Sequence, residues 1–187
     1  MKTQLNAELD LITDPGLHLL AQRTLAAAPE CFWTMPASTT GKHHPASSLG
    51  QGGLIRHTRS VVRIATHLLT MADITPVNPI WSCVITAAIL HDCVKKTDTE
   101  THTSFTHPLA AADLIRDTAR DLDKEQPNLL TPELVKITCA AVRSHMGRWC
   151  TSKHSHITLP IPVTAPERIV HTADYLASRE DITIARI

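Results

Sequence analysis

The sequence of 187 residues is poor in aromatic side chains and has no excess of charge of either sign. Phe, Trp and Tyr together make up 3% of it, and 18 Lys and Arg residues balance 18 Asp and Glu residues. The balanced charge excludes a molecule-wide positive field that would attract nucleic acid or anionic lipid, although it leaves room for a local basic patch. The scarcity of aromatic rings argues against an extended stacking surface for single-stranded nucleic acid.

Long apolar runs and paired cysteines are also missing. No stretch of about 18 apolar residues occurs, so the sequence offers no candidate membrane-spanning helix. The first residues, MKTQLNAELDLITD, carry acidic side chains where a signal peptide would be apolar. The 5 cysteines are scattered without a C-x-x-C pair, which argues against a disulfide framework or a zinc finger. We therefore expect a cytoplasmic protein that does not associate with membranes.

The composition that remains is that of a globular protein with strong helix signals. Hydrophobic residues make up 43% and charged residues 19% of the chain, and the length suits one main core. Capping residues followed by proline, and amphipathic patterns between them, indicate where helices begin and end. The predicted helices are 15–28, 53–72, 79–92, 108–122, 132–146 and 165–179. The sequence therefore predicts an all-α protein, a compact single bundle of about six or more helices.

Local signals at the helix ends make two further predictions. Thr164 and Glu167 have the Thr-x-x-Glu spacing of a capping box at the start of the last helix. Gly147 is a candidate left-handed cap that closes the helix before it. At the chain level, we expect residues 1–35 to form a helical extension packed on the core, and residues 36–187 to form the main domain.

Three long polar loops, 36–52, 93–106 and 147–163, separate the predicted helices. Loops of this length inside a compact domain are usually functional or disordered. All three border the histidines described next, which favours a functional role for them.

Histidine is the over-represented residue, with 12 copies. His91 and Asp92 follow the apolar run 80–90, whose end should lie in the interior, where a carboxylate needs a charged partner or a metal. Two readings are open for this pair. Both residues bind a metal, or Asp92 pairs with Lys95 or Lys96 while His91 caps the helix.

Two other helices carry comparable side chains. His57 lies in helix 53–72, and Asp174 lies among apolar residues of the last helix, where it also needs a partner. Imidazole and carboxylate groups from three helices suit a first-row divalent metal such as Mn, Fe, Co, Ni or Zn. His171, one turn before Asp174, is either an orienting residue or a surface residue.

The segments around these residues resemble the HD-domain metal-dependent phosphohydrolases. The matching stretches are GGLIRHT around His57, AAILHDCVK around His91 and Asp92, and HTADYLASR around Asp174, in the family order H…HD…D. The resemblance covers roughly residues 38–180. It implies an HD-domain helical bundle in which these four residues bind metal.

Two further histidines match the two-metal branch of this family, which has the order H…HD…H…H…D. They are His107, at the start of a helix, and His145, at the end of the next. The alternative reading is that His107 is an N-cap and His145 interacts with the helix dipole. The resemblance implies a site for two divalent transition-metal ions, Mn, Fe, Co, Ni or Zn, bridged by Asp92.

The same resemblance implies hydrolysis of a phosphomonoester or phosphodiester by a metal-activated hydroxide. Asp92 would help to orient the hydroxide. Lys95 stands at the lysine of the family's HD-x-x-K pattern, which contacts substrate phosphate, with an ordinary exposed lysine as the alternative. Lys42 and His44, from the loop before His57, are candidate substrate-binding residues. Arg148, beside His145, is another, with a surface salt bridge as its alternative role.

We expect the partner to be a small-molecule phosphate ester, a nucleotide rather than a polymer, because aromatic rings are few and the net charge is zero. One alternative is a 3′–5′ exonuclease acting on the ends of RNA or single-stranded DNA. Another is an oxygenase of the di-iron HD type. A non-enzymatic module is disfavoured because every core ligand of the family is present. The oligomeric state is open and includes a dimer.

Overall fold

The fold consists of helices joined by loops and short turns. A computed structural model of the chain describes residues 4–38, 44–96, 100 and 102–182. These residues form seven α-helices and two 3₁₀ turns, with no β-strand among them, which confirms the predicted all-α class. The elements are α1 (Asn6–Leu9), α2 (Pro15–Ala27), η1 (Glu30–Trp33), η2 (Ala46–Ser48), α3 (Gly53–Met71), α4 (Pro79–Leu90), α5 (His107–Glu125), α6 (Pro132–Ser144) and α7 (Ala165–Ala177).

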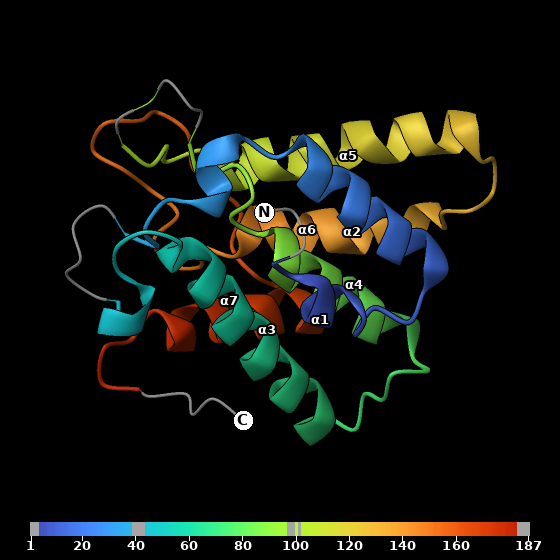
Figure 1. Cartoon of the computed structure of the whole chain (residues 1–187), viewed down its shortest axis with the longest axis horizontal. Coiled ribbons are helices and arrows are strands. Elements are labelled where there is room, and N and C mark those ends of the chain that lie inside the picture. Colours follow the sequence, from blue (N-terminus) through green and yellow to red (C-terminus); the bar gives the residue numbers. More distant parts are fainter. Residues whose placement is uncertain (1–3, 39–43, 97–99, 101, 183–187) are drawn as a thin grey trace.

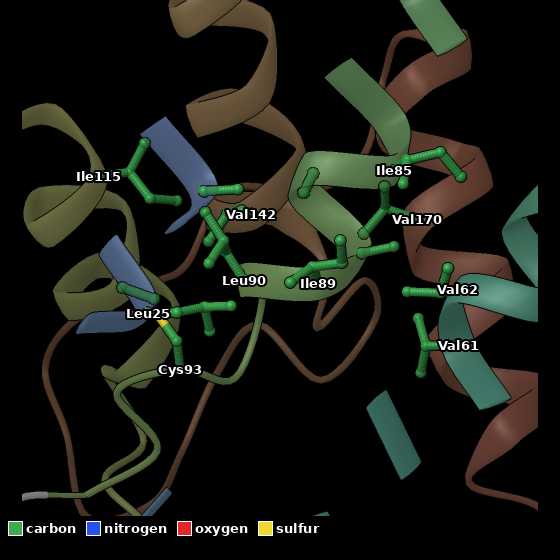
Figure 2. Close-up of a cluster of buried hydrophobic side chains, with 14 of the residues drawn as sticks. Leu25, Val61, Val62, Ile85, Ile89, Leu90, Cys93, Ile115, Val142 and Val170 are labelled. Carbon is green, nitrogen blue, oxygen red and sulfur yellow. The ribbon is translucent and has the colours of Figure 1, made fainter. Parts of the chain in front are cut away.

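Helix α4 is the centre of the bundle. Its residues from Trp81 to Leu90 are all buried, because apolar side chains occupy nearly every position rather than one face. Figure 2 shows Ile85, Ile89 and Leu90 of this helix among buried side chains from its neighbours. Burial of each such side chain contributes about 1.5–3 kcal/mol. The packing therefore fixes the carboxyl end of α4, where His91 and Asp92 follow.

The other long helices flank α4 as two packed pairs. Helices α3 and α7 pack against each other in the lower part of Figure 1, and α5 and α6 pack against each other in the upper part. Helix α4 contacts α3, α7 and α6. Within the described residues, none of the helices is both long and apolar enough to cross a membrane.

The starts of α2 and α4 follow the local capping signals, whereas the start of α7 differs from them. Asp14 accepts a hydrogen bond from the Leu17 amide at 2.8 Å, and Asn78 caps α4 in the same way. The predicted capping box at α7 is wrong in its geometry. The Thr164 hydroxyl donates to the buried Glu167 carboxylate at 2.8 Å and does not accept from the helix, because that carboxylate takes the acceptor role.

Helix α6 ends earlier than its sequence pattern suggests. The last helical residue is Ser144, and Gly147 follows after a short turn in the left-handed conformation, with φ of 57°. The glycine is required for a second reason, since a Cβ at this position would overlap the imidazole ring of His171. Gly147 therefore sets the direction in which the chain leaves His145.

The N-terminal segment packs on the bundle through α2, which contacts α4 and α5. Phe32 and Trp33, in the turn η1, are buried among core side chains. Hydrogen bonds tie the same segment to α4. The indole nitrogen of Trp81 donates to the Leu11 carbonyl at 2.9 Å, and the Ser82 hydroxyl oxygen accepts from two successive backbone amides. The division of the chain after residue 35 stays a prediction.

Replacing the buried Ser82 with alanine tests how strongly this tie stabilises the fold. Ser82 Oγ accepts from the amides of Thr13 at 3.1 Å and Asp14 at 3.0 Å. Because Ser82→Ala leaves both amides unpaired near the core, we expect the free energy of unfolding to fall by about 1–3 kcal/mol in urea titrations. The control is Thr70→Ala, whose hydroxyl bond is exposed. Equal stability of the two variants would contradict the proposed tie.

Candidate metal centre

The six predicted metal ligands come together at one end of the bundle. His91 and Asp92 directly follow α4. The other four come from separate helices: His57 from α3, His107 from the start of α5, His145 from the end of α6 and Asp174 from α7. Five of them form two groups in which one ligand atom per residue lies within 4.8 Å of the others. The groups are His57, His91, Asp92 and Asp92, His107, His145.

Three of the histidines are held by the same backbone contact. The Nδ1 atoms of His91, His107 and His145 each donate to the carbonyl oxygen three residues earlier in the chain. These acceptors are Ala88 at 2.9 Å, Ser104 at 2.7 Å and Val142 at 2.7 Å. The contact places the ring proton on Nδ1, so Nε2 of each ring carries a lone pair. Histidines that bind metal are commonly oriented by such a bond to their other nitrogen.

The free nitrogens then face other acceptors. Nε2 of His107 lies 3.2 Å from Nε2 of His145 and 3.1 Å from Oδ1 of Asp92. Nε2 of His91 lies 3.4 Å from Oδ2 of the same carboxylate. His91 Nε2 and Asp92 Oδ1 are buried and have no hydrogen-bond partner. Lone pairs crowded in this way repel one another unless a cation lies between them, and buried polar atoms are rarely left unpaired.

Asp174 completes the group around His57. Its Oδ1 lies 3.0 Å from Nε2 of His57 and 3.7 Å from Nε2 of His91. The Asp174 side chain is 20% exposed, whereas the two imidazoles are buried. Asp174 therefore forms the solvent-facing side of this group.

Electrostatics keeps these ligands in the protonation states that bind metal. Burial and the neighbouring His91 lower the pKa of His145 to about 3, so its ring is neutral at pH 7. Burial alone would raise the pKa of Asp92, but Lys95 and His91 hold it well below its usual range. Burial also raises the pKa of Asp174, but the hydrogen bond from His57 and the charges of His91, His57 and His145 together outweigh it and lower that pKa. The cluster thus presents two ionised carboxylates and a neutral imidazole at His145.

His91 shows the opposite tendency, which also indicates a cation. Burial lowers the pKa of His91, but the charges of Asp92 and Asp174 outweigh it and raise the pKa above its ordinary value. The carboxylates of Asp92 and Asp174 therefore favour positive charge at Nε2 of His91. A mixed set of imidazole and carboxylate donors fits two first-row divalent ions, with Asp92 shared between them.

A pocket with a volume of about 580 Å³ opens onto the cluster. Lys95, His44 and Arg148, three of the predicted substrate-site residues, line it, and Lys42 lies outside the described residues. Three residues that were not among the predicted site residues, Thr103, Ser178 and Arg179, also line the pocket. Their positions depend on how the loop before α5 and the end of α7 meet.

The predicted phosphate-binding lysine contacts the cluster directly. Nζ of Lys95 lies 2.5 Å from Oδ2 of Asp92, and the lysine side chain is 11% exposed. Lys96 instead donates to the Glu100 carbonyl. The two readings of the His91–Asp92 pair are therefore compatible, because Asp92 can pair with Lys95 and still belong to both ligand groups.

His44 and Arg148 occupy different parts of the pocket. The His44 ring centroid lies 5.2 Å from that of His57, and burial, followed by the charges of His57 and Lys95, lowers the pKa of His44 to about 4. His44 is therefore a neutral side chain beside the cluster. Arg148 is exposed at the rim, with its guanidinium 4.6 Å from the centroid of the Trp149 ring.

His171 has an orienting contact that the sequence left open. Its Nδ1 donates to the backbone carbonyl of His145 at 2.7 Å, and its ring lies against Gly147. The sequence signal was its place one turn before Asp174 on α7. His171 thus links the helix that carries Asp174 to the chain segment that carries His145.

Comparison with protein-family models gives a result that covers this whole cluster. The model of the family described as HD domain matches residues 54–179, which include all six clustered side chains. Searches of curated proteins and of solved structures found no match.

Alanine substitutions should divide the cluster into its two groups. Asp92→Ala removes the carboxylate that both groups share, so we expect metal content to fall from about two equivalents to well below one. His145→Ala affects one group and should leave about one equivalent. Elemental analysis of protein purified without chelator measures both, with exposed His154→Ala as the control. Full metal content in Asp92→Ala would refute the site.

Gly147→Ala tests the contact that positions His145. The variant would place a Cβ against the His171 ring, and it would force an alanine into the left-handed backbone conformation that Gly147 adopts. We therefore expect the free energy of unfolding to fall by about 2–4 kcal/mol and metal binding to weaken. Gly50→Ala is a matched control, because Gly50 is also left-handed but faces open space. The additional alteration His171→Ala should recover part of the loss. Equal losses of stability for Gly147→Ala and Gly50→Ala in denaturant titrations would contradict the proposed contact between His171 and Gly147.

Proposed function

The chain belongs to the HD-domain family, and on this premise we propose that it is a metal-dependent phosphohydrolase that cleaves a phosphomonoester or phosphodiester bond of a nucleotide. One observation supports the proposal above all others. Nitrogen and oxygen acceptors from five helical segments converge around Asp92, without enough protons to pair them, where a pocket opens. Such a centre fits a pair of divalent ions and not a packed core.

The chemistry divides between the metal pair and the side chains around it. Two divalent ions, when bound, would polarise a phosphoryl oxygen and supply hydroxide near neutral pH. Asp92 stays ionised and buried, and so can orient a nucleophile beside it. The ammonium of Lys95, on the pocket side of Asp92, is placed to stabilise charge that develops on phosphate oxygens. Neutral His44 can donate a hydrogen bond to the substrate.

The size and charge of the pocket support a small phosphate ester as substrate. Its volume of about 580 Å³ is in the range of sites for small molecules. Arg148 and Arg179 line it together with Lys95, so cations surround the approach to the cluster although the chain as a whole has no net charge. Guanidinium groups bind phosphate by two parallel hydrogen bonds.

Metal analysis combined with a phosphate-release screen tests this proposal. We expect protein purified without chelator to hold about two equivalents of Mn, Fe, Co, Ni or Zn and to release phosphate from at least one nucleotide. Removing the metal with a chelator should abolish release, and adding the metal back should restore it. Asp92→Ala is the inactive control.

Other results would assign a different activity. Release of nucleotides from an oligonucleotide, without turnover of free nucleotides, would identify a 3′–5′ exonuclease. Two iron atoms, dioxygen consumption and no phosphate release would identify the oxygenase. A content of about one equivalent would remove His107 and His145 from the ligand set.

A further inference from the structure

Four side chains form a stacked ladder at the rim of the pocket. The rings of Trp149 and Tyr175 are stacked, with centroids 5.6 Å apart and an interplanar angle of 26°. The guanidinium of Arg148 lies 4.6 Å from the Trp149 centroid, and that of Arg179 lies 5.7 Å from the Tyr175 centroid. All four residues line the pocket. Aromatic rings thus lie between two cations beside the metal centre.

The exposure of Trp149 is unusual for this chain. The other two tryptophans, Trp33 and Trp81, are buried, whereas Trp149 is 44% exposed. A chain that contains 3 tryptophans and 1 tyrosine places one of each on the wall of one pocket. Large exposed aromatic surface of this kind marks binding sites more often than it stabilises the fold.

The two aromatic residues of the ladder lie close in sequence to two of the candidate metal ligands. Tyr175 directly follows Asp174 on α7, and Trp149 lies four residues after His145. A ligand held on the ladder therefore lies close to the cluster. The distance between the two is set by the same two segments that carry the metal-ligand candidates.

From this arrangement we propose that the Trp149–Tyr175 stack binds the base of a nucleotide, while Arg148 and Arg179 hold its phosphate near the cluster. The ligand is one nucleotide unit, either free or at the end of a strand. The inference rests on the proposed function for its reaction, although binding of the base does not require catalysis.

The Arg148 guanidinium occupies the face of the Trp149 ring on which a base would stack. Arg148 is exposed and, among the described residues, has no carboxylate partner, whereas Arg179 pairs with Asp181 at 3.3 Å. An exposed contact between a guanidinium and a ring is weaker than a stacked base on an aromatic side chain. A base therefore displaces the guanidinium from the Trp149 face, and the freed charge moves to the phosphate.

Binding measurements on the metal-loaded protein test the ladder. The probes are AMP, the trinucleotide ApApA and ribose 5-phosphate, which has the phosphate and sugar of AMP but no base. Because Trp33 and Trp81 are buried, we expect AMP to quench the fluorescence of Trp149 in a saturable manner. By calorimetry, Trp149→Ala should weaken AMP binding about 5- to 50-fold and ribose 5-phosphate binding less than about twofold.

Two control variants define the expected pattern. Trp149→Phe retains a ring and should recover most of the AMP affinity. Ile161→Ala, an exposed residue of the same loop, should bind all three probes as the unaltered protein does. Tighter binding of ApApA than of AMP would identify a strand end as the source of the nucleotide, and the reverse a free nucleotide.

The outcomes separate this inference from the proposed function. Absence of saturable quenching by AMP and by ApApA, or equal losses for AMP and ribose 5-phosphate in Trp149→Ala, would overturn the base-binding ladder even if phosphate release is observed. Base-dependent binding without phosphate release from any nucleotide would support the ladder and overturn the hydrolase.

Discussion

The structure depends on a carboxylate buried where its most apolar helix ends. Asp92 follows α4, whose packing leaves little access to water, and an isolated charge in such a place is costly. Lys95 offsets part of that cost from one side. The remaining oxygen faces His107 and His145, whose free nitrogens offer lone pairs and not protons. The packing that stabilises the bundle therefore leaves the buried Asp92 carboxylate in need of a further cation.

The ends of the helices orient the histidines that surround Asp92. Carbonyl groups in the last turn of a helix have no partner within it. His91 and His145 each use one of these carbonyls, from Ala88 and Val142, to hold the proton on Nδ1. A bond that completes a helix end thus also fixes the tautomer that binds metal. This explains why these two histidines lie just beyond the ends of α4 and α6.

Local features of the sequence predicted the long helices, and the resemblance to the HD-domain family selected the candidate ligands. Capping residues act within a few positions, so Asp14 and Asn78 mark their helix starts correctly. The pair Thr164 and Glu167 shows the limit, since the same spacing allows the hydroxyl to donate or to accept. Contacts between distant segments had no such signal. The bond from His171 to the His145 carbonyl joins residues 26 positions apart, and only the packing of α7 beside the end of α6 brings them together.

The sharing of Asp92 also explains the position of the centre in the bundle. One ligand group draws on α3 and α4, with Asp174 of α7 beside it, and the other on the end of α4 with α5 and α6. These are the two packed helix pairs that flank α4. A cation bound to either group would therefore join the end of α4 to helices of one pair, and Asp92 is common to the two groups. Since such binding would favour the folded state alone, it would stabilise the junction between the two pairs. The pocket opens at this junction, so the candidate metal centre lies where the two helix pairs meet.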